Sequence, residues 1–98
     1  MTAPTVRQPV EQILLRLLNA TPAAPSFYDL RPPFARALGI RIPKEPVGKL
    51  WVLFALGSVL HQTLAALEEA GLARAVTIKR RRLWMLTERG RRAVEEPE

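Results

Sequence analysis

Basic side chains able to pair with phosphate groups are concentrated near the end of this 98-residue chain. Between Leu72 and Val94 there are eight Lys and Arg residues and one acidic residue, Glu88, which gives this stretch a net charge of +7 in a chain whose total is +6. The eight are Arg74, Lys79, Arg80, Arg81, Arg82, Arg89, Arg91 and Arg92. A basic concentration of this kind is typical of proteins that bind nucleic acids. An acidic protein partner, or a basic face that is merely solvated, is the alternative interpretation.

Residues suited to other chemistry are scarce. The chain has no cysteine and one histidine, His61, which excludes disulfides, thiolate nucleophiles and any motif that needs two histidines. It has no GxxxxGK phosphate-binding loop and no Ser-His-Asp spacing, and Asp29 alone among the acidic residues lies near aromatic side chains. The sequence therefore predicts a binding protein rather than an enzyme, with no cofactor and no metal site.

The composition predicts one globular domain to position these residues, because 48% of the residues are hydrophobic and 24% are charged. We place this domain at 9–94, between a flexible leader (1–8) and an acidic tail (95–98). Pro9 suits the first position of a helix, and apolar residues follow at helical spacing to about residue 19. A proline-rich connector, 21–25, comes next.

A second helical unit is expected to begin at Ser26, because Ser26 and Asp29 have the spacing of a capping box. Pro32 and Pro33 are expected to break this unit into two turns, since a proline inside a helix lacks the N–H that the helix needs. Gly39 is expected to end it. Residues 40–48 contain two further prolines and are expected to form an extended or looped insert.

A long apolar helix is the most regular feature of the pattern. One stripe of residues spaced by three and four runs to a glycine that is expected to end the helix: Leu50, Leu53, Gly57, Leu60, Leu64, Leu67 and Gly71. We expect a single helix of about 22 residues, because the stripe is unbroken. The alternative is a turn at Gly57, with Ser58 as the N-cap of a separate helix.

The first half of this helix is apolar nearly all round, because Trp51, Val52 and Phe54 lie off the leucine stripe. A helix of this kind must be buried or lie in an interface, so we expect these three residues to contact a second copy of the chain. A membrane span is disfavoured, since the uncharged apolar stretch Leu50–Leu60 is shorter than the roughly 20 residues that a span requires. The N-terminus does not resemble a signal peptide, which favours a cytoplasmic location.

After Gly71 the hydrophobic period changes from 3.6 to 2, which predicts a β-hairpin. Ala73–Ile78 and Leu83–Leu86 are the expected strands, and the basic segment 79–82 is the expected tip. Trp84 and Met85 alternate, and we expect Trp84 to pack in the core rather than to stack on an unpaired base. Thr87 is expected to cap a short last helix.

Two segments at hairpin spacing resemble the winged-helix regulators of the MarR, ArsR and PadR kind. SVLHQTLAALEEAGLARA, which begins at Ser58, is similar to their recognition helix and the strand after it, and LTERG, which begins at Leu86, is similar to the motif after their second wing strand. The resemblance covers 58–94 and implies a mainly α fold with a small β-hairpin, the winged helix-turn-helix. The first half of the chain departs from this pattern and more loosely resembles the N-terminal domain of Mrr-like restriction proteins, which leaves the docking geometry open.

The resemblance implies binding of double-stranded DNA by a small transcriptional regulator, with the long helix in the major groove and the basic wing on the backbone or in the minor groove. If the domain binds DNA, the residues between the buried leucines of the long helix are expected to face the major groove, and those assigned to base contacts are Ser58, Val59, His61, Gln62 and Thr63. The residues assigned to the wing and phosphates are Lys79, Arg80, Arg81, Arg82 and Arg89. A homodimer is expected, because one such domain covers few base pairs. A protein–protein adaptor of the same fold, and an RNA or single-strand binder, are the alternatives.

Overall fold

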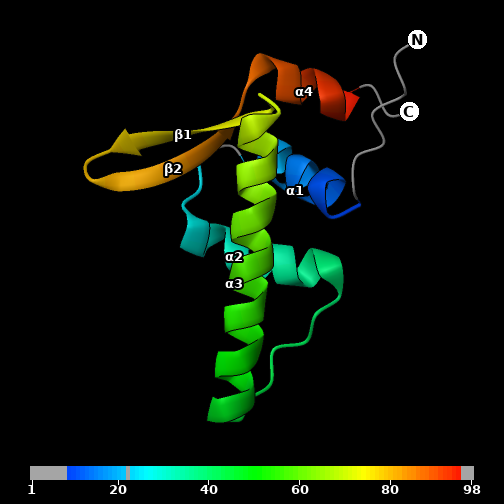
Figure 1. The fold of residues 1–98 in the computed structure, drawn as a ribbon, viewed down its shortest axis with the longest axis vertical. Coiled ribbons are helices and arrows are strands. Elements are labelled where there is room, and N and C mark those ends of the chain that lie inside the picture. The colour runs from blue at the N-terminus through cyan, green and yellow to red at the C-terminus, as the bar shows by residue number, and fades with distance from the viewer. Residues whose placement is uncertain (1–8, 22, 96–98) are drawn as a thin grey trace.

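The computed structural model describes residues 9–21 and 23–95, so the expected leader (1–8) and most of the expected tail (96–98) lie outside the described residues. In chain order the elements are α1 (Pro9–Ala20), α2 (Phe27–Leu38), α3 (Pro46–Glu69), β1 (Ala73–Ile78), β2 (Arg81–Leu86) and α4 (Glu88–Glu95). The described chain is thus mainly helical with one antiparallel hairpin, as predicted. Figure 1 shows α1 and α2 crossing α3, with the hairpin extending to one side of the upper part of α3.

The expected break in the second helical unit is wrong, because α2 continues through Pro32 and Pro33 as one helix. Its first turn is held by the predicted capping box: the Asp29 N–H donates to Ser26 Oγ at 3.2 Å and the Ser26 N–H donates to Asp29 Oδ2 at 3.1 Å. Each proline removes one helical hydrogen bond. The burial of Phe34 and its neighbours against the core offsets that loss.

The long helix is continuous, so the alternative with Ser58 as the cap of a separate helix is wrong. The helix also begins earlier than expected, because Pro46 occupies its first turn, where the missing N–H costs nothing. The insert is therefore shorter than the predicted 40–48 and covers only 39–45. Gly71 ends the helix as predicted: its φ is +77°, and its N–H donates to Glu68 O at 3.0 Å.

The hairpin turn is tighter than the predicted four-residue tip. Ile78 pairs directly with Arg81, which leaves Lys79 and Arg80 as a two-residue turn with φ values of 51° and 67°. Positive φ at both central positions defines the type I′ turn, whose twist matches that of the flanking strands. Thr87 caps α4 as expected, with Gly90 N–H donating to its Oγ1 at 3.0 Å.

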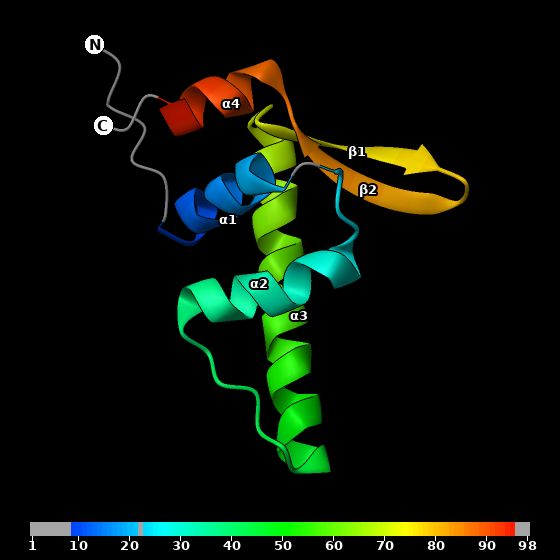
Figure 2. The same ribbon diagram turned by 180° about the vertical axis from the view of Figure 1, so that it is seen from behind.

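The core occupies only the upper part of the molecule. Leu14 of α1, Phe34 of α2 and Trp84 of β2 are buried around the C-terminal half of α3, where Leu60 and Leu64 are fully covered. The burial of Trp84 confirms the prediction that this residue packs in the core. The N-terminal half of α3 projects beyond the other elements, as Figures 1 and 2 show from opposite sides.

Within the described residues, α3 is the one helix that is long and apolar enough to cross a membrane by length and composition. The helix, however, contacts α1, α2 and β1, and its buried leucines, Leu56, Leu60, Leu64 and Leu67, all lie from its middle to its C-terminal end. The C-terminal half is the core helix of a small globular domain.

Candidate nucleic-acid interface

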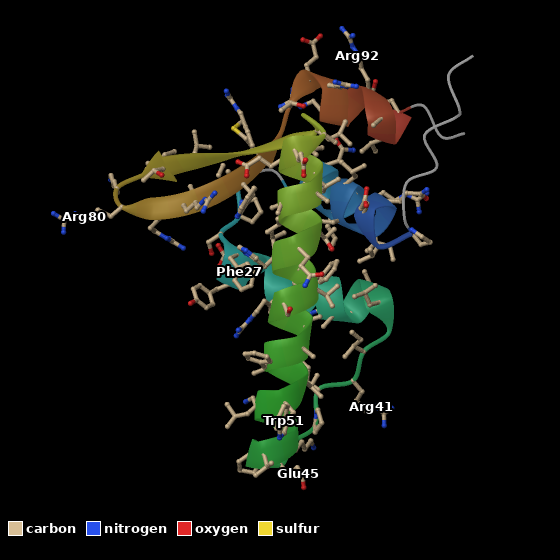
Figure 3. The ribbon with its side chains drawn as sticks, viewed as in Figure 1. Phe27, Arg41, Glu45, Trp51, Arg80 and Arg92 are labelled. Atoms are coloured by element: carbon tan, nitrogen blue, oxygen red, sulfur yellow. The ribbon has the colours of Figure 1, made fainter. Side chains whose placement is uncertain are left out.

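The hairpin tip presents two cations to solvent. Lys79 and Arg80 are exposed, and neither has an ion pair or hydrogen bond to a described residue. Figure 3 shows the Arg80 side chain pointing away from the body of the molecule at the far end of the hairpin. Because the turn fixes the backbone at both residues, the two charges lie at the far end of the hairpin, away from α3.

The next two arginines of the hairpin are held by contacts with the rest of the domain. Arg81 Nη2 lies 3.7 Å from Asp29 Oδ2 at the start of α2, and both side chains remain more than half exposed. Arg82 Cζ lies 5.1 Å from the centroid of the Trp84 ring, within cation–π range. Because Arg81 and Arg82 are adjacent on β2, their side chains leave opposite faces of the hairpin.

The capping box and the ion pair act on the same carboxylate. Hydrogen bonds from the backbone and side chain of Ser26 hold the pKa of Asp29 below its ordinary value, and the positive charge of Arg81 lowers this pKa further. Asp29 is therefore ionised at neutral pH and connects the hairpin to the first turn of α2.

A main-chain contact also fixes the hairpin to the segment before α2. Trp84 N–H donates to Pro25 O at 2.8 Å, and Ser26 forms an isolated antiparallel bridge with Leu83. This isolated bridge was not predicted, because a single bridge leaves no period-2 pattern in the sequence. The capping-box residues were the one available sign that this segment is ordered.

The face of α3 beside the core carries four of the five residues that the helical pattern assigns to base contacts. Ser58, Val59, His61 and Gln62 are exposed. Thr63 is not: it is 5% exposed, and its hydroxyl donates to Val59 O at 2.7 Å. The assignment of Thr63 to base contact is therefore wrong.

The reason for the burial of Thr63 lies in its spacing. Thr63 is three residues after Leu60 and seven after Leu56, so it falls on the same buried stripe as these leucines. At the C-terminal end of the exposed face, Glu68 and Glu69 are both exposed. These carboxylates repel phosphate, which confines any groove contact to the 58–62 part of the helix.

The arginines of α4 do not extend the basic surface of the hairpin. Arg92 Nη2 pairs with Glu88 Oε1 at 2.9 Å, one helical turn earlier, whereas Arg89 is exposed beside Gly71. Figure 3 shows Arg92 and Arg80 pointing in different directions. The +7 stretch is thus divided between the hairpin and α4 rather than forming one patch.

The projecting half of α3 carries a row of large exposed apolar side chains. Val47, Leu50, Trp51 and Phe54 are 65%, 70%, 70% and 76% exposed and lie at i, i+3, i+4 and i+7, on one face of the helix. We call these four residues the apolar stripe. Val52, which was grouped with Trp51 and Phe54 as a dimer contact, lies off this stripe and is half-buried.

A shallow groove runs along one side of the apolar stripe and is completed by Leu53 and by Arg31 of α2. The Arg31 guanidinium carbon lies 5.3 Å from the ring centroid of Tyr28. No group of three or more potential metal ligands occurs in the part of the chain that the structure describes.

Comparisons of the chain with protein-family models, with curated proteins and with solved structures gave no match.

Proposed function

We propose that this protein is a small winged-helix transcriptional regulator that binds double-stranded DNA in the cytoplasm. The observation that carries the proposal is a pair of cations, Lys79 and Arg80, which have no partner among the described residues and lie at the end of a hairpin attached to the domain at Pro25 and Asp29. A narrow structure that ends in basic side chains fits the DNA backbone or the minor groove, where the negative potential is strong.

The exposed face of α3 is the proposed reader of the major groove, which is wide enough to admit an α-helix. Gln62 presents the donor and acceptor that suit adenine, and Val59 presents an apolar surface to a thymine methyl group. His61 and Ser58 are placed to contact phosphate or a base edge. Thr63 takes no part, because it is buried.

The proposed regulator is a homodimer, and its interface is the apolar stripe. Four large apolar side chains that are each about two-thirds exposed or more form an unusual surface for a monomer of this size. An antiparallel partner helix from a second copy brings Val47 opposite Phe54 and Leu50 opposite Trp51, so the same four residues fill both sides of the contact. Two copies also double the number of base pairs that are contacted.

A protein–protein adaptor is the second candidate function, and the exposed apolar stripe is the observation that favours it. In that case the stripe binds a different protein and the basic hairpin contacts an acidic surface on it. A single-strand binder receives no comparable support, because Trp84, the residue considered for base stacking, is only 6% exposed and is covered by Arg82.

Competition binding distinguishes these candidates. The protein is titrated into a fluorescent random-sequence duplex at low salt, and unlabelled duplex, single-stranded DNA and RNA are then added as competitors. We expect the duplex to compete best. Absence of duplex binding at 50 mM salt would contradict the proposal and leave the adaptor function as the better account.

A further inference from the structure

The hairpin carries one large apolar side chain that is exposed, Ile78 at the end of β1. It is 52% exposed, whereas the other large apolar side chains of the two strands are buried or half-buried. Ile78 directly precedes the turn residues Lys79 and Arg80, so an apolar surface lies beside two exposed cations at the tip. An apolar side chain gains nothing from a phosphate group, but it suits contact with the faces of DNA bases.

The exposure of Ile78 follows from the placement of its neighbours. Ile78 pairs with Arg81 across the hairpin, so the two side chains leave the same face. Arg81 Nη2 lies 3.7 Å from Asp29 Oδ2, and this contact directs the long Arg81 side chain toward α2. Ile78 is thus left uncovered on one face of a hairpin whose tip is charged.

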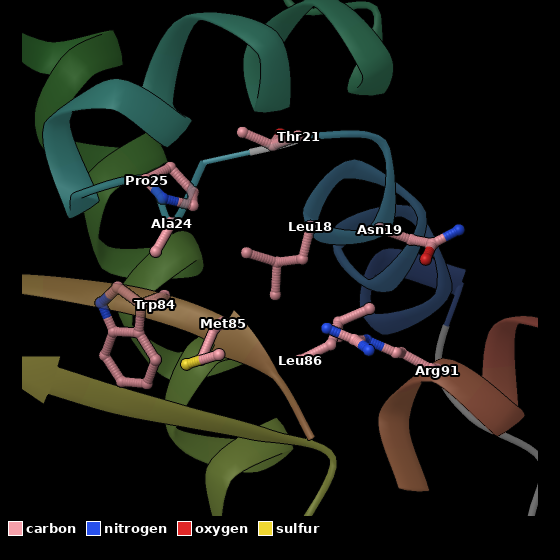
Figure 4. Close-up of a pocket in the computed structure, with 9 residues that line it drawn as sticks. All are labelled: Leu18, Asn19, Thr21, Ala24, Pro25, Trp84, Met85, Leu86 and Arg91. Atoms are coloured by element: carbon pink, nitrogen blue, oxygen red, sulfur yellow. The ribbon is translucent and has the colours of Figure 1, made fainter. Parts of the chain in front are cut away.

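The base of the hairpin is fixed to the body of the domain. Trp84 of β2 is 6% exposed, and its backbone N–H donates to Pro25 O at 2.8 Å. Figure 4 shows Pro25 and Ala24 of the connector beside Trp84, in the cavity that Leu18 of α1 also lines. Because the base is held in this way, the tip can press on a pair of stacked bases without the whole hairpin swinging away.

We infer that Ile78 is a wedge that inserts between two base pairs from the minor groove and kinks the duplex. This inference rests on the proposed function, which brings the hairpin to DNA. A minor groove of ordinary width, about 6 Å, is narrow for a two-stranded ribbon, which the wider major groove admits. An apolar side chain between two base pairs unstacks them and bends the duplex toward the major groove, which opens the minor groove. Lys79 and Arg80 then pair with phosphates along the opened groove.

The wedge also gives the hairpin a sequence preference without any hydrogen bond to a base. Pyrimidine–purine steps, TA and CA/TG, unstack and kink more easily than other steps. Insertion of Ile78 therefore costs least at such a step, and we expect one to lie under the hairpin in the preferred binding site.

The test measures ring closure, which requires no knowledge of the preferred site. A random-sequence duplex of about 120 base pairs is shorter than the persistence length of about 150 base pairs, so ligase closes it into rings slowly unless a protein bends it. At saturating protein we expect the parent to raise the rate of ring closure at least tenfold. Ile78→Thr keeps a β-branched residue in the strand and should reduce this gain at least fivefold. Thr77→Ser, at the exposed position beside it, is the matched control and should keep the gain.

The Kd for the linear duplex is measured first for each protein, so that every ring-closure assay is run with the duplex saturated. A parent that binds the duplex without speeding ring closure would overturn the wedge and leave the proposed function standing. An Ile78→Thr protein that speeds ring closure as much as the parent would overturn it equally. A parent that does not bind the duplex at all would contradict the proposed function, and the wedge with it. Sites selected from random duplexes should be enriched in TA and CA/TG steps for the parent and not for Ile78→Thr.

Discussion

The carboxylate of Asp29 lies 3.7 Å from the Arg81 guanidinium while it also accepts the Ser26 N–H at 3.1 Å. One side chain thus completes the N-terminal cap of α2 and contacts the basic hairpin. Since the hairpin projects from the core, contacts such as this one and the Trp84–Pro25 hydrogen bond set its direction relative to α3.

This arrangement predicts how stability depends on pH. The pKa of Asp29 is lowered in the folded protein by Ser26 and Arg81, so Asp29 contributes stability above its unfolded pKa of about 3.9 and that contribution is lost as the pH falls through the folded value. We expect Asp29→Asn to be less stable than the parent at pH 7 and to lose less stability between pH 6 and pH 3. Urea denaturation at both pH values measures the effect. An identical pH dependence in the two proteins would show that the cap and ion pair contribute nothing.

Substitution by alanine is expected to change stability in opposite directions at two glycines, Gly90 and Gly57. A Cβ on Gly90 would lie 2.0 Å from Leu72 O, so Gly90→Ala must move α4 away from the core, and we expect a loss of at least about 2 kcal/mol. A Cβ on Gly57 would make only an ordinary contact, 3.5 Å from Phe27. Because alanine favours helix by about 1 kcal/mol over glycine, Gly57→Ala should stabilise the protein by about that amount. Thermal unfolding of the two variants checks both signs, and destabilisation by Gly57→Ala would contradict the continuous α3.

The apolar stripe predicts dimerisation that depends on concentration. Trp51 and Phe54 are 70% and 76% exposed, and their combination with Val47 and Leu50 in an antiparallel pair removes all four from water. We expect the parent to sediment as a dimer at tens of micromolar and Trp51→Glu/Phe54→Glu to sediment as a monomer. Ile78→Glu changes an apolar residue that is 52% exposed on the hairpin and should leave the dimer intact.

A parent that stays monomeric at high concentration would remove the proposed dimer. The same protein is then mixed with anionic lipid vesicles, because an exposed row of tryptophan, phenylalanine and leucine on a helix also suits a membrane surface. Vesicle binding that is lost in Trp51→Glu/Phe54→Glu would assign the stripe to a membrane instead of a second copy.

Substitutions at two neighbouring positions of α3 are expected to differ in their effect on base preference, because Gln62 is exposed and Thr63 is buried. Gln62→Ala should relax base preference at one position of the binding site, with a loss of about 1–3 kcal/mol on the preferred sequence and little change on others. Thr63→Val keeps the shape of a buried side chain and should leave the preference unchanged. Selection of binding sites from random duplexes, carried out for the parent and both variants, provides the comparison. Equal weakening of all sequences by Gln62→Ala would show that Gln62 does not read bases.

Local signals in the sequence were sufficient to predict most of this fold. The Ser26–Asp29 capping box, the stop at Gly71 and the change of period after it each depend on neighbouring residues, and each is present in the structure. The continuation of α2 through Pro32 was not predictable in the same way. It depends on packing of Phe34 against elements that are distant in the sequence.

The candidate site was predicted less completely than the fold. The helical pattern placed Thr63 between leucines and so suggested exposure, but Leu60 and Leu56, one and two turns before Thr63, show that this position belongs to the buried stripe. The tight turn at Lys79 and Arg80 was missed, because type I′ turns are usually marked by Asn-Gly. A cavity lined by Leu18, Pro25, Trp84 and Arg91 combines residues from four segments, and no spacing in the sequence indicates it.

The most direct test of the central claim is the salt dependence of duplex binding by the parent and by Lys79→Asn/Arg80→Gly. This variant removes two charges from the hairpin tip but supplies the residues that a type I′ turn favours, so it should be at least as stable as the parent. Each phosphate contact contributes about −0.9 to the slope of log affinity against log salt concentration, so the loss of two contacts should flatten the slope by about 1.8. Equal slopes for two folded proteins would contradict the claim that the hairpin tip binds DNA.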